Sequence, residues 1–368
     1  MIIKELTGQN FRNLSEFSFE PSSGTNLFFG KNAAGKTNIL EAVSLCFGFG
    51  FRRAAPRVIR SLQALSSERT EVNAKVSFDA FGDKQTDVTY SINPEKQLAS
   101  VSVDGIPRKS AAEIYGEMKY VVFVPEHLAI VKGAPDIRRD YIDRVASLHT
   151  KAHAKQIIYH KNALRQVPYA EYNKDLLDSY LEVLTRAGLN LTYGRLKYFN
   201  RLKSHAVRIF GELTNYRETL NMEYVSSVFG QIDDLDMTDK DALYAQYINK
   251  ISLLGTGGRV EYGVHRDDIT FTINGGDTKL YASQGQIRSV TIALKLAETE
   301  LIKELGGERP VVLLDEVLGE LDENRREFLT SRLEGVQVFV TSCNEHEFGG
   351  GNLKVFKVEG GTVEPYEI

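Results

Sequence analysis

The stretch LFFGKNAAGKTNILEAV, from Leu27 to Val43, joins an apolar run to a helix-forming run through a loop bounded by glycines. The loop matches the phosphate-binding pattern G-x-x-x-x-G-K-[ST]. In this pattern successive backbone N–H groups surround the β- and γ-phosphates, and the following helix N-terminus adds a partial positive charge. Lys36 would neutralise phosphate oxygens, and the Thr37 hydroxyl would hold Mg²⁺. We therefore predict a strand–loop–helix nucleotide site over these residues: Gly30, Lys31, Asn32, Ala33, Ala34, Gly35, Lys36 and Thr37.

The composition is that of an ordinary globular protein and sets limits on its partners. The 368 residues suffice for two domains with separate cores. Cys46 and Cys343 belong to no C-x-x-C pair, which indicates reduced thiols and argues against a zinc site. No stretch has the length of a membrane span and the N-terminus lacks a signal-peptide pattern, so we expect a cytoplasmic protein. Because the formal net charge is −4, any binding of nucleic acid must come from a local basic patch.

The hydrophobic pattern changes along the chain and divides it. Alternating residues predict a hairpin over 1–21 and an antiparallel sheet over 70–105, and an apolar run predicts a buried strand before Pro125. From 136 to 254 apolar residues recur at helical spacing, without the sustained heptads of a long coiled coil. Strand character resumes at 259–283, and the C-terminal third alternates helix and strand. We predict one α/β domain built from 1–135 and 255–368, interrupted by a helical domain at 136–254.

A second chemical signal ends the apolar run Val311–Leu314. Such a run is typical of a strand buried in a parallel sheet. The carboxylate of Asp315 at its tip could hold Mg²⁺, directly or through water. Glu316 could then act as the general base on a water in line with the γ-phosphate. Acidic pairs also occur at ordinary strand-end turns, and it is the combination with the phosphate loop that favours a catalytic role.

A third signal is the segment YASQGQIRSVTIALKLAE. Ser283 and Gln286 have capping-box spacing, with Ser283 as the N-cap of an amphipathic helix. The segment could be only a well-capped helix, but its hydroxyl, glycine and helix N-terminus also make a second phosphate-binding surface. One chain has little use for two helix N-termini on the same phosphates. Two chains facing head to tail would use both.

These segments, together with NFRNL, VPEHLAIVKGAPDIRRDYID and YGVHRDDITFTING, resemble the RecF family of bacterial recombination-repair proteins over essentially the whole chain. That family belongs to the ABC-type ATPases, alongside the SMC proteins. The resemblance implies an SMC-like ATPase head of mixed sheets and helices with an inserted helical arm. It also implies ATP-dependent homodimerisation on DNA, weak Mg²⁺-dependent ATP hydrolysis, and work with RecO and RecR in loading the RecA recombinase at gaps and junctions.

The resemblance also assigns residues. Asn38 joins the loop residues that bind ATP, Asp315 is the magnesium aspartate, and Ala33 stands where glycine is common. The signature that would cap the ATP of the partner consists of Ser283, Gln284, Gly285 and Gln286. Arg12 would reach the nucleotide, or would be an exposed turn residue. Gly319 replaces a common serine, Asp322 is retained, and no switch histidine is expected at His346. We expect His265 and Arg266 to support the signature helix rather than to touch DNA.

Three basic clusters could contact DNA through its phosphates, without sequence specificity. The first contains Arg52, Arg53, Arg57 and Arg60. The second contains Lys132, Arg138, Arg139 and Arg144 among interleaved acids. The third contains Arg195, Lys197, Arg201, Lys203 and Arg208; of these, Lys197, Arg201 and Arg208 would share one helix face, and Tyr198 and Phe199 would pack inward. Each cluster alone is equally consistent with a solvated surface.

Two other functions share part of this chemistry. The nucleotide-binding subunit of an ABC transporter would place its signature nearer the phosphate loop and would carry a switch histidine. An SMC-like chromosome protein would carry a long coiled coil. We therefore favour an ATP-dependent clamp on duplex DNA and on junctions between single and double strands, with RecO and RecR as partners and no membrane association.

Overall fold

The structure is a computed structural model, and it describes residues 1–48, 59, 69–78, 84–96, 98–108, 113–114, 118–344 and 352–367. Its contacts group the chain into two compact units. Unit 1 contains Met1–Glu126 and Glu298–Ile368, and unit 2 contains His127–Ala297. The contacts thus divide the chain at other places than the sequence-based boundaries 135/136 and 254/255. The second boundary lies later than expected because the strand Asp268–Ile273 pairs with the strand Leu220–Ser226 inside the expected helical segment.

Unit 1 contains a mainly parallel sheet with the order β18-β17-β3-β16-β15-β8. The strands are β3 (Thr25–Phe29), β8 (Tyr120–Phe123), β15 (Val311–Asp315), β16 (Val338–Ser342), β17 (Leu353–Glu359) and β18 (Thr362–Tyr366). All but β18 run parallel. Every residue of β8, β15 and β16 is buried, as continuous apolar runs predict. The ring of Phe28 on β3 stacks on Phe339 and Phe356 of the neighbouring strands, which fixes the strand that leads into the phosphate loop.

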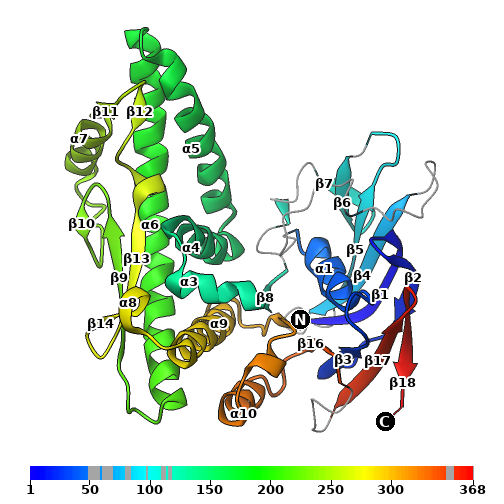
Figure 1. The fold of residues 1–368 in the computed structure, drawn as a ribbon. Coiled ribbons are helices and arrows are strands. Elements are labelled where there is room, and N and C mark those ends of the chain that lie inside the picture. Colours follow the sequence, from blue (N-terminus) through cyan, green and yellow to red (C-terminus); the bar gives the residue numbers. More distant parts are fainter. Residues whose placement is uncertain are drawn as a thin grey trace. The chain divides into compact units, whose positions relative to one another are not determined.

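A second, antiparallel sheet in unit 1 has the order β2-β1-β4-β5-β6-β7. Its strands are β1 (Ile2–Phe11), β2 (Leu14–Phe19), β4 (Thr70–Phe78), β5 (Lys84–Ile92), β6 (Ala99–Val103) and β7 (Ile106–Arg108). The predicted hairpin and the predicted antiparallel sheet are both present. Helix α1 (Lys36–Cys46), which directly follows the predicted phosphate loop, contacts strands of both sheets (Figure 1).

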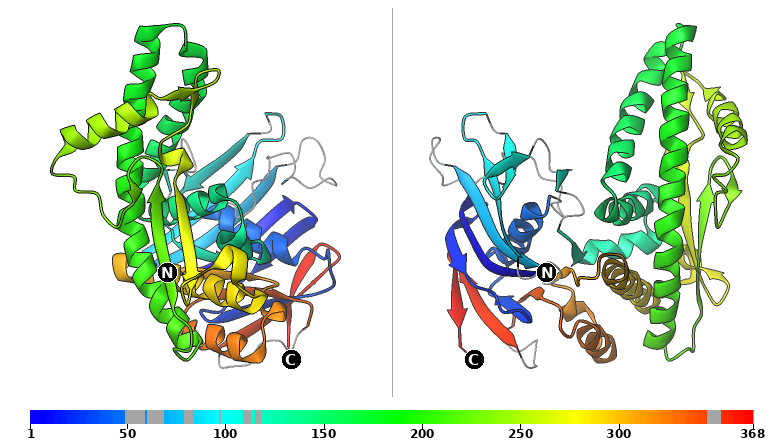
Figure 2. Two further views of the ribbon diagram at one scale, coloured as in Figure 1. Left: turned by 60° about the vertical axis from the view of Figure 1, so that its left-hand side comes forward. Right: turned by 180° about the vertical axis from the view of Figure 1, so that it is seen from behind.

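Unit 2 is built around the 40-residue helix α6 (Lys174–Leu213). Helix α5 (Lys151–Ala170) packs along it, and α4 (Pro135–His149) contacts both. Against α6 also lie α7 (Lys240–Ile251) and a sheet of order β10-β9-β13-β14, whose strands are β9 (Leu220–Ser226), β10 (Gly230–Gln231), β13 (Asp268–Ile273) and β14 (Gly276–Asp277). Figure 2 shows this unit from two further sides. The segment predicted as a helical domain to residue 254 also contains the strand β9, which pairs with β13.

Short elements complete the two units. They are the 3-10 helices η3 (Pro125–Leu128), η4 (Val264–Arg266) and η5 (Leu318–Glu320), the helices α3 (Ala129–Lys132) and α8 (Thr278–Tyr281), and the paired strands β11 (Leu254–Gly255) and β12 (Arg259–Val260). Residues 278–281 form a helix and not the end of a strand segment, because Asp277 accepts a hydrogen bond from the Lys279 N–H and caps it. Helix α9 (Gln284–Gly306) begins in unit 2, and α10 (Glu323–Arg332) lies in unit 1. In the part of the chain that the structure describes, we find no helix long and apolar enough to cross a bilayer.

Candidate functional site

The loop that follows β3 turns through two residues with left-handed backbone. These are Ala33, with φ 64°, and Gly35, with φ 114°. A Cβ atom on Gly35 would lie 2.7 Å from Asn13 Oδ1, so glycine is required there for space as well as for conformation. Ala33 carries a Cβ, so its positive φ costs energy that glycine would not pay. Glycine is common at this position in the family that the sequence resembles.

The Lys36 side chain is buried inside this loop. Its Nζ donates hydrogen bonds to the carbonyl oxygens of Gly30 at 2.8 Å and Lys31 at 3.3 Å. It also lies 3.4 Å from Glu316 Oε1. The predicted phosphate-binding cation is therefore held at the loop, with carbonyl acceptors that a phosphate oxygen could replace.

The predicted magnesium residues lie in contact. Thr37 Oγ1 donates to Asp315 Oδ1 at 2.7 Å, and Thr341 Oγ1 donates to the same oxygen at 2.8 Å. Asp315 ends β15 and Thr341 lies on the adjacent strand β16, so the parallel pairing of these strands brings the two side chains together. The carboxylate of Asp315 is buried. No sequence signal indicated that Thr341 would be its second hydrogen-bond partner.

Glu316 follows with an unusual backbone. Its φ is 54°, and its N–H donates to Thr341 Oγ1 at 2.9 Å. This conformation costs energy for a residue with a Cβ and is held here by the neighbouring strand. The side chain is 49% exposed and reaches Lys36, so the candidate general base stands beside the candidate phosphate cation.

Asn13 is a loop contact that sequence reasoning missed. Its Nδ2 donates to the carbonyl oxygens of Ala33 and Ala34, and its Oδ1 accepts from Asn38 Nδ2 at 2.6 Å. These hydrogen bonds attach the turn between β1 and β2 to the phosphate loop. The only sequence signal was its place in NFRNL, a segment used for the resemblance but not for assigning a role.

Arg12, the residue before Asn13, is bound to a helix rather than to the loop. Its guanidinium makes a two-pronged ion pair with the carboxylate of Glu41 on α1, with Nη2 donating to Oε1 at 2.6 Å. Glu41 is 1% exposed, so this carboxylate depends on Arg12 for its charge partner. Arg12 is therefore not an exposed turn residue, and its proposed contact with nucleotide would begin from this anchored position.

Cys343 also lies at the loop, although the sequence indicated only a reduced thiol. Its Sγ donates to Asn32 Oδ1 at 3.1 Å and lies 3.6 Å from Lys36 Nζ. It follows β16 directly, so the same strand that brings Thr341 to Asp315 brings this thiol to the loop. His346 lies outside the described residues.

In unit 2, Ser283 and Gln286 form the predicted capping box. Ser283 Oγ accepts from the Gln286 N–H, and Gln286 Oε1 accepts from the Ser283 N–H at 2.8 Å. Gln286 Nε2 donates to Glu218 Oε1 at 2.6 Å, which ties the start of α9 to the segment between α6 and β9. Ser283 and Gln284 are exposed and Gly285 is half-buried. The signature thus presents an exposed helix N-terminus, while its predicted apolar face is buried: Ile287, Val290, Leu294, Ala297 and Leu301.

The candidate DNA residues have different outcomes. Arg52, Arg53, Arg57 and Arg60 lie outside the described residues. On α6 the predicted shared face is present, with Lys197, Arg201 and Arg208 exposed and Tyr198 and Phe199 buried. Arg208 forms an ion pair with Glu212 one turn along the helix, so part of its charge is neutralised locally.

Arg138 of the second cluster and Arg195 of the third are structural and cannot serve as surface contacts. Arg138 is 0% exposed and makes a two-pronged ion pair with Asp268. Arg195 is buried and pairs in the same way with Asp143, while its Nη1 donates to the carbonyl of Val264. Burial would raise the pKa of Asp143, but Arg195 outweighs burial and holds it well below its usual range.

The segment HRDD, at 265–268, mainly holds unit 2 together. Asp267 accepts hydrogen bonds from the Tyr224 hydroxyl and the Ser227 N–H, and burial raises its pKa. Asp268 also pairs with Lys279 on α8, the short helix that precedes the signature. The hydrogen bond and ring contact of His265 go to Val260 and His160, not to α9.

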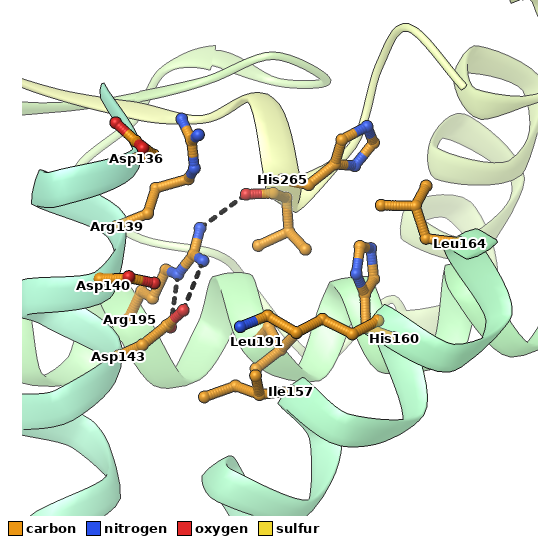
Figure 3. A pocket seen from close by; sticks show the side chains of 12 residues that line it. Asp136, Arg139, Asp140, Asp143, Ile157, His160, Leu164, Leu191, Arg195 and His265 are labelled. Atoms are coloured by element: carbon orange, nitrogen blue, oxygen red, sulfur yellow. Dashed lines mark hydrogen bonds and ion pairs between the residues drawn. The ribbon is translucent and has the colours of Figure 1, made fainter. Parts of the chain in front are cut away.

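A cavity of about 210 Å³ lies between α4, α5, α6 and η4 in unit 2 (Figure 3). Arg139, Arg195 and Lys161 line it beside Asp136, Asp140 and Asp143, so its charges balance. Burial lowers the pKa of His160 to about 3 and that of His265 to about 4, and nearby cations add to the effect. Both imidazoles are therefore neutral at pH 7.

The comparisons with known proteins agree with this geometry. Residues 2–363 match the family described as "RecF/RecN/SMC N terminal domain". A protein of Lachnoclostridium phytofermentans named "DNA replication and repair protein RecF" is 34% identical over 99% of each chain. One of the same name from Caldanaerobacter subterraneus subsp. tengcongensis is 32% identical, again over 99% of each.

Solved structures show the same relationship. The structure described as "the recombination mediator protein RecF-ATP in RecFOR pathway" superposes with a TM-score of 0.88 at 30% identity, covering 99% of this chain and 97% of the other. An Smc head domain from Pyrococcus furiosus superposes with a TM-score of 0.55 at 13% identity over 99% and 95% of the two chains, which shows the fold alone. The predicted ATPase-head fold is confirmed.

Proposed function

The chain belongs to the RecF family, and from that premise we propose that it is an ATP-dependent DNA-binding protein of recombinational repair. ATP closes two copies on duplex DNA near single-strand gaps, slow hydrolysis releases them, and RecO and RecR act with the clamp in loading RecA. The relatives named for the RecFOR pathway and for bound ATP support this assignment. The observation that carries it is the contact of Lys36, Thr37, Asp315 and Glu316 at one loop.

ATP would bind first at the phosphate loop. The Lys36 ammonium would exchange its bonds to Gly30 and Lys31 for phosphate oxygens, and the amides at the start of α1 would face the same charge. Asn13 and Asn38 hold the loop in place through three hydrogen bonds. The backbone of the loop would therefore need little rearrangement when nucleotide binds.

The same site fits a divalent cation. Thr37 Oγ1 and Asp315 Oδ1 lie 2.7 Å apart. Both are oxygen atoms, the kind of ligand that Mg²⁺ prefers. These two residues would hold Mg²⁺, which neutralises phosphate charge when it is bound. Glu316 would accept the proton of the attacking water, because it stands beside Lys36 and remains accessible to solvent.

Dimerisation would use the other phosphate-binding surface. Ser283, Gln284, Gly285 and Gln286 form an exposed, capped helix N-terminus, which favours an anion. We assign them to the ATP bound by a second copy. Since each nucleotide would then contact both chains, ATP would favour the closed dimer by its differential affinity for that state.

DNA contacts in this proposal come from Lys197, Arg201 and Arg208 on α6, together with Arg52, Arg53, Arg57 and Arg60. Lysine and arginine side chains bind phosphates of any sequence, so the protein would not be sequence specific. Dimer closure would place two weak patches on one duplex. The gain in effective concentration explains how a chain of net charge −4 could hold DNA.

The test compares the parent with Lys36→Ala and Ser283→Arg, each with ATP and Mg²⁺, with ADP, and without nucleotide. Sedimentation velocity measures dimerisation, and fluorescence anisotropy with a gapped duplex measures DNA binding. Lys36→Ala should lose nucleotide. Ser283→Arg should keep ATP but neither dimerise nor hold DNA.

Two further variants control for side effects of the arginine. Ser283→Asn preserves the N-cap, whose loss costs about 1 kcal/mol, and Ser179→Arg adds the same charge to an exposed serine of α6. Both should dimerise with ATP. Normal dimerisation of Ser283→Arg would show that the nucleotide site is not shared between copies.

A further inference from the structure

Helix α5 carries an unusual distribution of charge. Its 20 residues include four cations and no acid, in a chain whose net charge is −4: Lys151, Lys155, Lys161 and Arg165. All four side chains are exposed. These cations are spaced four to six residues apart and therefore form no cluster along the sequence.

The outward face of α5 forms one continuous stripe. Residues 151, 155, 158, 162, 165 and 169 follow each other at steps of three or four, which places them along one side of the helix. At 1.5 Å per residue this stripe runs for about 27 Å. The opposite face is buried and carries His153, His160, Ala163 and Val167, and α5 packs along α6 (Figure 1).

Large exposed side chains accompany the cations. Ile158 and Tyr159 are about half exposed, and beyond them Tyr169 is 85% exposed and Tyr172 is 96% exposed. Tyr169 lies in the last turn of α5 and Tyr172 in the turn that leads to α6. Exposed rings next to cations indicate a ligand with both flat apolar faces and negative charge.

Two cations of this stripe, Lys155 and Arg165, differ from two exposed arginines of α6. On α6, Arg186 and Arg208 are each paired with a glutamate one turn away. Among the described residues, no carboxylate forms an ion pair with Lys155 or Arg165. Their positive charge is therefore available to an outside anion.

We propose that the outer face of α5 binds single-stranded DNA. Lys155 and Arg165 contact its phosphates, and Tyr169 and Tyr172 stack on unpaired bases, whose faces a duplex keeps covered. This inference rests on the proposed function and adds to it a site for the single-stranded part of a gap. Charge complementarity and the exposed rings together favour this ligand over an acidic protein, which would not need aromatic platforms.

The experiment uses the full chain with ATP and Mg²⁺ and three fluorescent probes: a dT oligonucleotide, a duplex and a gapped duplex. One variant combines Lys155→Gln with Arg165→Gln, and another combines Tyr169→Ala with Tyr172→Ala. The first should bind dT several-fold more weakly and lower the slope of log K against log salt by about 1.4, since each phosphate contact contributes about 0.7. The second should weaken dT binding about 30-fold or more, because the loss of each stacked base weakens binding about fivefold or more.

Matched variants separate this surface from general effects. Arg186→Gln with Lys240→Gln removes the same charge from α6 and α7 and should leave dT binding unchanged. Tyr169→Phe with Tyr172→Phe keeps the rings and should restore binding that alanine loses. ATP-dependent dimerisation should be the same in all of these variants.

Three results would overturn the inference and leave the proposed function intact. If the α5 variants bind dT as tightly as the parent, the surface does not contact single strands. If charge removal weakens duplex and dT equally and the tyrosines have no effect, the face is a duplex contact. If DNA binding is intact but capture of RecR or RecO is lost, it is a protein-docking face. A parent that holds no DNA in any nucleotide state would instead refute the proposed function, and this inference with it.

Discussion

Acid should destabilise unit 2 through the two histidines that face its cavity. Burial is the main cause that lowers the pKa of His160 to about 3 and that of His265 to about 4. A histidine in the unfolded chain titrates near pH ~6.5. Between those values the unfolded chain binds more protons than the folded chain, so the free energy of unfolding falls as pH falls.

The size of the effect follows from these pKa values. At pH 5 each imidazole of the unfolded chain has gained about 2 kcal/mol from proton binding that the folded chain does not share. The two histidines together therefore cost up to about 4 kcal/mol relative to pH 7.5. His160 is 4% exposed, and no described residue forms a hydrogen bond with its ring, so His160→Leu leaves no partner unsatisfied.

Urea unfolding followed by circular dichroism at pH 7.5 and pH 5 measures this contribution. The parent should lose about 2 kcal/mol more than His160→Leu between the two pH values. Leu164→Val changes the lining of the same cavity without a titratable group, and its difference from the parent should be equal at both pH values. If His160→Leu also differs from the parent equally at both, the buried imidazole is not held neutral and the reasoning fails.

Three further substitutions test the nucleotide site and the buried ion pairs. Glu316→Gln should slow single-turnover ATP hydrolysis about 100-fold or more, because it removes the proposed general base. ATP affinity should change less than about fivefold, because the half-exposed ion pair of Glu316 with Lys36 is worth at most ~1 kcal/mol. Equal losses of rate and affinity would contradict a role as general base. Glu41→Gln should lower the stability of unit 1 by about 2 kcal/mol in thermal unfolding, because the Arg12 guanidinium loses its buried carboxylate; an unchanged melting curve would show that the pair is dispensable. Asp143→Asn should cost about 3 kcal/mol in urea unfolding, because Arg195 loses its two-pronged buried carboxylate and keeps only the more distant Asp267, 4.0 Å from its Nη1. A loss below about 1 kcal/mol would show that water reaches the site.

Local patterns predicted the parts of the site that depend on neighbouring residues. The phosphate loop, the strand ending at Asp315 and the capping box of Ser283 and Gln286 each involve residues within about one turn or one strand. Backbone geometry over such distances follows from residue type, as Gly35 shows with its φ of 114° and its lack of room for a Cβ. The sequence predicted the contact between Thr37 and Asp315 only indirectly, because both residues were assigned to the same Mg²⁺.

The sequence did not predict which of the basic residues are buried and which are exposed. Arg138 and Arg195 belong to the basic clusters that the sequence shows, whereas Lys155 and Arg165 belong to none of them. The folded chain buries Arg138 against Asp268, 130 residues away, and Arg195 against Asp143, 52 residues away. Lys155 and Arg165 stand apart in sequence and form one surface only because α5 turns its other face to α6.

The sequence by itself predicted a site for nucleotide phosphates and the helix N-termini that could form it, because these predictions depend on short-range spacing. It also determined the family, through motifs that extend over nearly the full length. The tertiary structure alone decided that Asn13 clasps the loop, that Glu41 holds Arg12, and which cations reach solvent. A charge is exposed or buried according to the partners that distant segments bring to it, and no local pattern contains that information.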